Sequence, residues 1–164
     1  MQIIAVCEYQ DEAATAGPSW VQSTSGVPMV DSVDRKIRSW MMSKIRHKDT
    51  KPEMIVRRLI HKEGYRYRLH DKRLPGKPDL VFRQRSKVIF VHGCFWHLHE
   101  NCKKSRPPKS RQDFWLPKLE ANRERDDRNI AKLREMGWEV LVIWECELGE
   151  TDRLLAKIKY FLNN

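Results

Sequence analysis

The stretch Val88–Cys102 reads VIFVHGCFWHLHENC and joins an apolar run to a cluster of chemically reactive side chains. Its first four residues are β-branched or aromatic, which is typical of a buried strand. A second short run of this kind, Leu80–Phe82, precedes it across the polar segment 83–87. The two runs predict a hairpin that leads directly into the reactive cluster.

The next strand is expected at residues 138–144, WEVLVIW, an almost continuous apolar run that predicts burial on both faces. It follows a long charged segment, about 115–136, in which spaced apolar positions and the terminal Gly137 indicate a helix. A strand after a crossover helix normally runs parallel to a neighbour. We therefore expect an α/β fold with a mixed β-sheet flanked by helices.

The remaining elements lie on either side of this centre. Thr50 and Glu53 have the spacing of a capping box, which predicts a helix ending near Gly64. Alternation over residues 65–69 predicts a half-buried strand, and a last helix is expected from Thr151. Residues 1–33 lack a sustained period, so we expect a flexible leader before a single domain at 34–164.

The charge of the chain points to a polyanionic partner. The whole sequence carries +10, and residues 1–33 contain four acidic residues but no Lys or Arg, so residues 34–164 carry +14. An excess of one sign in so small a domain favours nucleic acid binding. No run is long enough to span a bilayer, and no secretion signal is visible, so we expect a cytoplasmic protein.

Cysteine and histidine gather in the stretch quoted above. Cys94, His97, His99 and Cys102 lie within nine residues, and Cys146 ends the last predicted strand. In a reducing compartment such clustering favours a metal over disulfides. Four thiolate or imidazole ligands form a closed structural zinc site. These residues alone do not decide between the two histidines, so one imidazole is left over.

Asp79 is the candidate for a second metal. It stands where a turn enters a strand, and Mg²⁺ takes a few hard oxygen ligands together with water. An ordinary turn explains a lone Pro-Asp pair equally well. However, two adjacent strands would bring Asp79 close to His92 and His97, and phosphodiester hydrolysis needs such a cation.

Three aromatic residues have no assigned core position. Phe95 and Trp96 lie between the predicted zinc ligands, and Trp115 follows a basic, proline-rich segment. On a metal-bound loop such side chains are expected to be poor core formers and good wedges between base pairs. A core role stays open for Phe95 and Trp96.

Four motifs together resemble the very-short-patch mismatch repair endonucleases. They are VIFVHGCFWHLHENC, PGKPDLVF, DTKPEMIVRRL and RQDFWLPKLEANRERDDRNIAKLREMGWEVLVIWEC, and the likeness runs from about residue 34 to 162. The resemblance implies a restriction-endonuclease-like core and a monomer that nicks one DNA strand 5′ of a thymine mispaired with guanine. Because this mispair arises by deamination of 5-methylcytosine, the resemblance also implies a cytosine-5 DNA methyltransferase as functional partner, with mismatch repair proteins and a repair polymerase downstream.

The resemblance further implies roles for single residues. Asp79 matches the aspartate that binds Mg²⁺, with the backbone carbonyl of Val91 as a second protein ligand. Glu53 matches a carboxylate that helps to hold water on that metal, although the capping box explains it as well. Most of the superfamily carries an acidic residue and a lysine where this chain has Val91 and His92.

The catalytic histidines are assigned in the same way. His97 matches the general base that activates water, and Asp126 matches its orienting carboxylate in preference to the neighbouring Asp127. His92 matches a second active-site histidine near the scissile phosphate.

The zinc ligands implied by the family are Cys94, His99, Cys102 and Cys146, and this chain has one extra residue between His99 and Cys102. Phe95, Trp96 and Trp115 match residues that wedge into the DNA from the major groove, while the helix at 35–45 matches an element that clamps the opposite groove. Two alternatives remain: a restriction-type nuclease that is indifferent to mismatches, and a zinc-stabilised DNA-binding module without catalysis.

Overall fold

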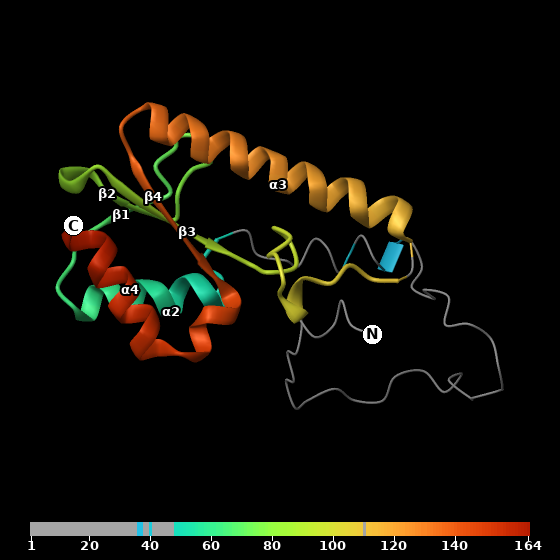
Figure 1. Ribbon diagram of the computed structural model, residues 1–164, viewed down its shortest axis with the longest axis horizontal. Helices are drawn as coiled ribbons and strands as arrows, with labels where there is room; N and C mark the ends of the chain where they lie inside the picture. Colours follow the sequence, from blue (N-terminus) through green and yellow to red (C-terminus); the bar gives the residue numbers. More distant parts are fainter. Residues whose placement is uncertain (1–35, 38–39, 41–47, 110) are drawn as a thin grey trace.

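The structure is a computed structural model that describes residues 36–37, 40, 48–109 and 111–164. Its main elements are α2 (Lys51–Lys62), β1 (Arg68–Leu69), β2 (Leu80–Phe82), β3 (Lys87–His92), α3 (Gln112–Glu135), β4 (Glu139–Trp144) and α4 (Thr151–Asn163) (Figure 1). The predicted leader at 1–33 and most of the helix expected at 35–45 lie outside the described residues.

The strands of the described chain form one sheet in the order β1-β2-β3-β4. The pairs β1–β2 and β2–β3 are antiparallel, whereas β3 and β4 are parallel. Helix α3 crosses one face of the sheet, and α2 and α4 lie against the other (Figure 1). The predicted α/β class, with a mixed sheet flanked by helices, is confirmed.

Alternate residues of β3 supply the two halves of the core, as the period of a strand requires. Ile89 packs with Val56 of α2 and Ile158 of α4, whereas Val88 packs with Leu133 of α3. Strand β4 was expected to be buried on both faces, and its side chains do pack on both. Because it is an edge strand, however, only Ile143 is fully buried among its residues.

The first strand is shorter than predicted. Alternation suggested a strand over 65–69, but only Arg68 and Leu69 pair with β2. Tyr65 and Tyr67 instead pack against the core cluster beneath the sheet, and the hydroxyl of Tyr67 donates to the carbonyl of Arg57 at 3.2 Å. Tertiary packing therefore takes these side chains out of the strand.

The topology brings three distant segments to one end of the sheet, where β3 and β4 finish and β2 begins. Parallel pairing aligns His92 at the end of β3 with Trp144 at the end of β4. The loop after β3 and the segment after β4 therefore begin side by side. Strand β2 runs antiparallel to β3. Asp79 directly precedes β2 and therefore lies at this same end of the sheet.

Candidate active site and zinc-binding cluster

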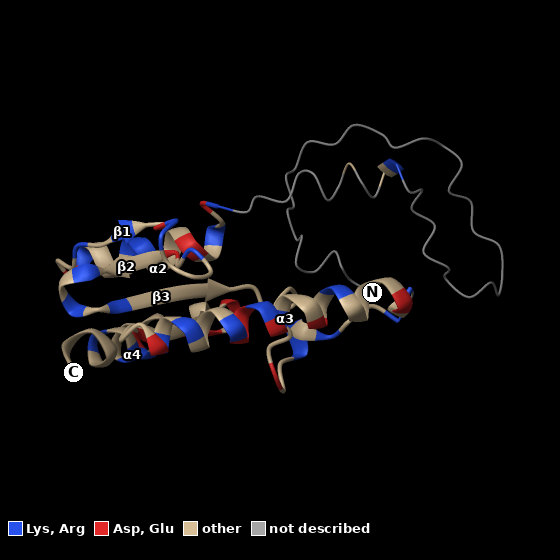
Figure 2. Cartoon of the chain, turned by 90° about the horizontal axis from the view of Figure 1, so that it is seen from above, with Lys and Arg blue, Asp and Glu red and all other residues tan. Residues whose placement is uncertain are grey.

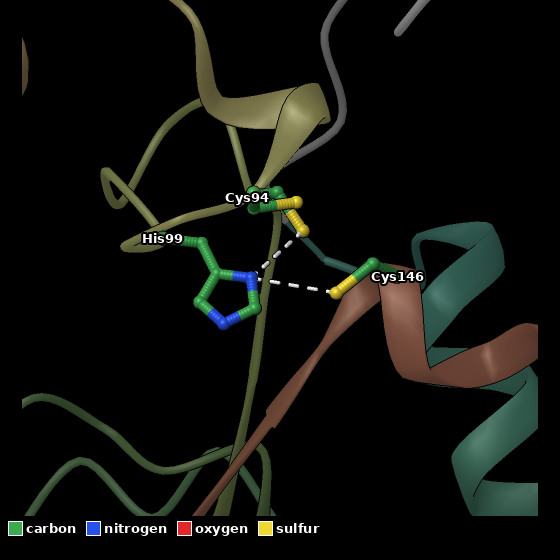
Figure 3. A group of neighbouring side chains, drawn as sticks. Cys94, His99 and Cys146 are labelled. Atoms are coloured by element: carbon green, nitrogen blue, oxygen red, sulfur yellow. Dashed lines mark hydrogen bonds between the residues drawn. The ribbon is translucent and has the colours of Figure 1, made fainter.

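The loops that follow β3 and β4 carry a compact group of sulfur and nitrogen donors. Ligand atoms of Cys94, His99, Cys102 and Cys146 all lie within 4.8 Å of one another. His99 Nδ1 is 3.6 Å from Sγ of Cys94 and 3.4 Å from Sγ of Cys146 (Figure 3). Zinc–sulfur bonds of about 2.3 Å separate tetrahedral donors by roughly 3.8 Å. The donor set and its spacing therefore fit a structural zinc ion.

The backbone of the loop accommodates the extra residue before Cys102. Leu98 and Asn101 adopt left-handed conformations, with φ of 48° and 55°, and the amide of His99 donates to the carbonyl of Cys94 at 3.0 Å. Asn visits this region more readily than most residues. The loop folds back on itself, and Cys102 reaches the other three donors.

Burial sets the chemistry of these thiols. It raises the pKa of Cys94 to about 12, and it also raises the pKa of Cys146. A metal ion bound to a buried thiol lowers the pKa of that thiol again, because the form that binds the metal is the thiolate. The described cluster is thus suited to a bound cation and not to free reactive cysteines.

His97 is turned away from the zinc-binding cluster and pairs with α3. Its Nδ1 contacts Oδ2 of Asp126, which is the member of the Asp126–Asp127 pair that reaches the imidazole. A carboxylate only accepts, so Nδ1 carries the proton and the lone pair of Nε2 is free. This is the tautomer that a general base needs.

His92 lies against His97 at the end of β3. Their rings are stacked with centroids 3.9 Å apart, and Trp144 meets His92 edge-on at 5.4 Å. Burial, followed by the neighbouring His97, lowers the pKa of His92 to about 3. His92 is therefore a neutral imidazole, able to donate or accept one hydrogen bond.

Trp144 connects the two centres. Sequence reasoning had placed it in the core, but its ring stacks on that of His99 at 4.1 Å, with planes 7° apart. It also lines a hollow of about 320 Å³ together with His92, His97, Asp126 and Arg123. Because His99 also lines it, the zinc-binding cluster adjoins the hollow that His92 and His97 line.

Asp79 is held at the edge of β3 by the backbone. Its Oδ2 accepts a hydrogen bond from the amide of Val91 at 2.7 Å. The pKa of Asp79 is raised to about 6, chiefly by burial and also by the charge of Glu53, while the Val91 bond and the neighbouring Arg57 and His97 act to lower it. The carboxylate therefore lies within electrostatic reach of both α2 and the catalytic loop.

The carbonyl of Val91 is a plausible second ligand on structural grounds. Leu80 pairs with Ile89, and extending that antiparallel register by two residues places Pro78 opposite Val91. Proline has no N–H, so the ladder offers this carbonyl no donor. The N–H and C=O of a strand residue point to the same side, which is where Asp79 lies. A carboxylate and a free carbonyl fit Mg²⁺.

Glu53 makes only half of the predicted capping box. Its amide donates to Oγ1 of Thr50 at 3.4 Å, as expected. Its carboxylate contacts Arg57 instead, and Oε1 lies 3.1 Å from Nε2 of His70. With an exposed fraction of 3%, this side chain is committed to the site and not to the helix end.

Phe95 takes the core position that the sequence left open, and Trp115, which was expected to be a poor core former, is buried as well. Phe95 and Trp115 are 4% and 1% exposed, and they pack with Leu119 in a cluster of their own. Trp96 is partly exposed, and Nζ of Lys118 lies 5.6 Å from its ring centre. Their role as wedges stays a prediction, and Trp96 is the most accessible of them.

Sequence reasoning missed two residues beside Asp79. Arg57 follows Glu53 by four residues, one turn of helix, and that spacing could have predicted their ion pair. His70 has no comparable signal. It reaches the site because its backbone is left-handed, with φ of 46°, which no spacing rule foresees.

Comparison with known proteins identifies the family of the chain. A family model described as DNA mismatch endonuclease Vsr matches residues 30–104. A type II nicking enzyme of Xanthomonas oryzae, V.XorIIP, is 50% identical over 82% of this chain and 98% of its own length. The chain belongs to the Vsr family of DNA mismatch endonucleases.

A further relative supports the same assignment. The DNA mismatch endonuclease Vsr of Escherichia coli is 43% identical over 77% of this chain and 80% of its own length. Among solved structures, the catalytic domain of the homing endonuclease I-Bth0305I covers 69% of this chain and 94% of its own, at 19% identity and a TM-score of 0.47. This Vsr-family chain is thus a DNA endonuclease, and within its described residues no helix is long and apolar enough to cross a membrane.

Proposed function

We propose that the protein nicks one strand of duplex DNA on the 5′ side of the thymine in a T·G mispair, with Mg²⁺ as cofactor. The observation that carries the proposal is the contact between His97 Nδ1 and Asp126, which leaves Nε2 free beside the hollow. The mismatch preference rests on family membership, because the Escherichia coli relative is a mismatch endonuclease and others are nicking enzymes.

The residues that would hold the metals are those whose donors converge. Asp79 and the carbonyl of Val91 would hold Mg²⁺, and Glu53 would bind water on it. Cys94, His99, Cys102 and Cys146 would hold structural Zn²⁺. When bound, Mg²⁺ supplies positive charge against the negative charge that develops at phosphorus.

The chain's own groups account for the proton movements. His97 Nε2 takes a proton from water as the water oxygen attacks phosphorus, and the bond from phosphorus to the 3′ oxygen breaks. Asp126 holds the imidazole in its orientation and stabilises the positive charge that forms on it. Neutral His92, buried against His97, can donate to a phosphate oxygen. The departing 3′ oxygen takes a proton from solvent water, so the products are a 5′-phosphate and a 3′-hydroxyl.

The DNA would lie across the end of the sheet where these groups meet. Lys and Arg are spread over α2, α3 and the strands, with acidic residues between them (Figure 2). Arg123 lines the hollow and would contact a phosphate. Trp96 would enter the base stack, and Phe95 and Trp115 would support or follow it.

The proposed reaction also implies partners and a place. A cytosine-5 DNA methyltransferase supplies the base whose deamination creates the mispair, and a repair polymerase extends the 3′-hydroxyl. Mismatch repair proteins would act on the same lesion. We propose a cytoplasmic monomer, since one active site suffices for one nick.

The test is a nicking assay on a panel of duplexes that share one sequence. T·G, T·A and C·G versions are compared in Mg²⁺ and in EDTA, with varied flanks. Nicking confined to T·G and to Mg²⁺ is expected. Equal cutting of paired duplexes would favour a restriction-type nuclease, and binding without any cutting would favour a non-catalytic module.

A further inference from the structure

A network of polar side chains adjoins Asp79 through His70. It joins Arg57 and Glu53 of α2 to His70, which follows β1. His70 lies between two carboxylates: its Nε2 is 3.1 Å from Oε1 of Glu53, and its Nδ1 is 3.8 Å from Oδ1 of Asp79. None of the roles assigned above uses His70.

The contact with Arg57 favours one tautomer of His70. Nη2 of Arg57 lies 2.9 Å from His70 Nε2. A guanidinium can only donate, so Nε2 is the acceptor and Nδ1 carries the hydrogen. Nδ1 lies 3.8 Å from Oδ1 of Asp79, the oxygen not bound by the amide of Val91, which is too far for a direct hydrogen bond but close enough for electrostatic attraction.

The same cluster is not a metal site of its own. Asp49, Glu53 and His70 have donors close enough together to hold an ion. However, Arg57 contacts all three of them, so its guanidinium already supplies the positive charge. The role of His70 must then be sought in its contact with Asp79.

The backbone places His70 at a conformational cost. Its φ of 46° lies in the left-handed region, which residues other than glycine adopt sparingly. Such conformations persist where the surroundings hold them, and they gather at functional sites. Here the surroundings are Arg57 and Glu53, which are both buried side chains of α2.

We propose that His70 is a positioning residue for the metal-binding carboxylate, linking the Arg57–Glu53 pair to Oδ1 of Asp79 through its Nδ1–H. This inference rests on the proposed function, in which Asp79 holds Mg²⁺. The two oxygens of Asp79 are then oriented from two sides, by Val91 and by His70. Outer partners that orient a ligand typically change metal affinity or activity by about 10- to 100-fold.

Three variants at one position test the link. His70→Ala removes both nitrogens, His70→Asn keeps an N–H near the place of Nδ1, and His70→Gln keeps a polar group near the place of Nε2 only. We expect the Mg²⁺ concentration for half-maximal nicking of a T·G duplex to rise about 10-fold in the Ala and Gln variants. The Asn variant should stay near the wild type, and binding of the duplex should change in none.

A second readout does not depend on nicking. Binding of Mn²⁺ to the zinc-loaded, DNA-free protein is followed by loss of the free-ion electron paramagnetic resonance signal, with Asp79→Ala as background. Weaker Mn²⁺ binding is expected for Ala and Gln but not for Asn. Should the Ala variant fail to fold, the comparison of Asn with Gln decides.

Different outcomes would overturn the proposed function and the role of His70. A wild type that neither nicks the T·G duplex in Mg²⁺ nor binds Mn²⁺ above the Asp79→Ala background would overturn the proposed function. A wild type that does both, with Asn and Gln variants alike in their metal dependence, would overturn the role of His70 alone.

Discussion

The imidazole rings of His92 and His97 lie parallel, 3.9 Å apart between centroids and 8° apart in plane. His92 is the last residue of β3, and His97 lies in the loop that the zinc-binding cluster closes. The stack holds the plane of His97, while Asp126 fixes its Nδ1. Together the two contacts direct Nε2, which is the atom on which the proposed chemistry depends.

Replacing the carboxylate of Asp126 should disable the base without removing it. In Asp126→Asn the amide can donate to Nδ1 of His97, which moves the proton to Nε2. We expect the single-turnover nicking rate to fall by about 10²- to 10⁴-fold, the usual value of general-base catalysis, with unchanged DNA binding. Asp127→Asn is the matched control, because Asp127 lines the same hollow. Equal losses in both variants would contradict the assignment.

Removing the carboxylate of Asp79 should separate binding from cutting. Asp79→Ala is expected to abolish detectable nicking while the affinity for a T·G duplex, measured by fluorescence anisotropy, stays near that of the wild type. Zinc content should also be unchanged, since Asp79 is not one of the four clustered donors. Residual Mg²⁺-dependent nicking by this variant would show that another group holds the metal.

Much of this site was open to sequence reasoning because its groups lie in short runs or at strand ends. The parallel pairing of β3 and β4 follows from an apolar strand after a crossover helix, and it explains why Cys146 joins Cys94. The choice of His99 over His97 came from the resemblance alone. The structure shows its physical basis, because the loop turns His97 toward α3.

What the sequence could not provide depends on tertiary packing. The burial of Phe95 and Trp115 arises where the loop meets the start of α3, so neither segment reveals it alone. The capping pattern at Glu53 was read correctly for the helix start but not for the carboxylate, because Arg57 and His70 compete for it. Local patterns predict helices and strands, whereas the positions of these side chains depend on contacts between elements.

Loss of one zinc ligand should remove metal and fold together. Cys94→Ser is expected to contain less than stoichiometric zinc by mass spectrometry and to accumulate as insoluble protein, because structural zinc contributes folding free energy directly. Cys7 lies outside the described residues and is not one of the zinc ligands that the family resemblance implies, so Cys7→Ser is the matched control. A soluble, zinc-free Cys94→Ser protein with cooperative unfolding would refute a structural role.

The pH dependence of stability should respond to Asp71. Hydrogen bonds from Arg73, and then from Arg83, hold the pKa of this carboxyl well below its ordinary value. A depressed folded pKa stabilises the fold above the unfolded pKa of about 3.9 and loses that effect as pH falls below it. Asp71→Asn should therefore unfold at lower urea than the wild type at pH 7.

The difference between these two proteins should shrink when the titration is repeated near pH 3.5. Glu135→Gln, an exposed substitution at the end of α3, serves as control and should show no such trend. A gap that stays constant with pH would mean that Asp71 acts through packing and not through its charge.

The aromatic cluster should divide into a residue that stabilises the fold and one that contacts DNA. Trp115 is almost fully buried, so Trp115→Ala should cost about 3–5 kcal/mol in urea unfolding. Trp96 is partly exposed, and Trp96→Ala should cost less stability but weaken T·G duplex binding by about 1–3 kcal/mol, the value of stacking a base on an aromatic ring. Trp96→Phe keeps a ring and should recover most of the binding. If Trp96→Ala bound the mismatch as tightly as the wild type, the wedge would have to come from a buried residue, and the loop would have to open before DNA could be engaged.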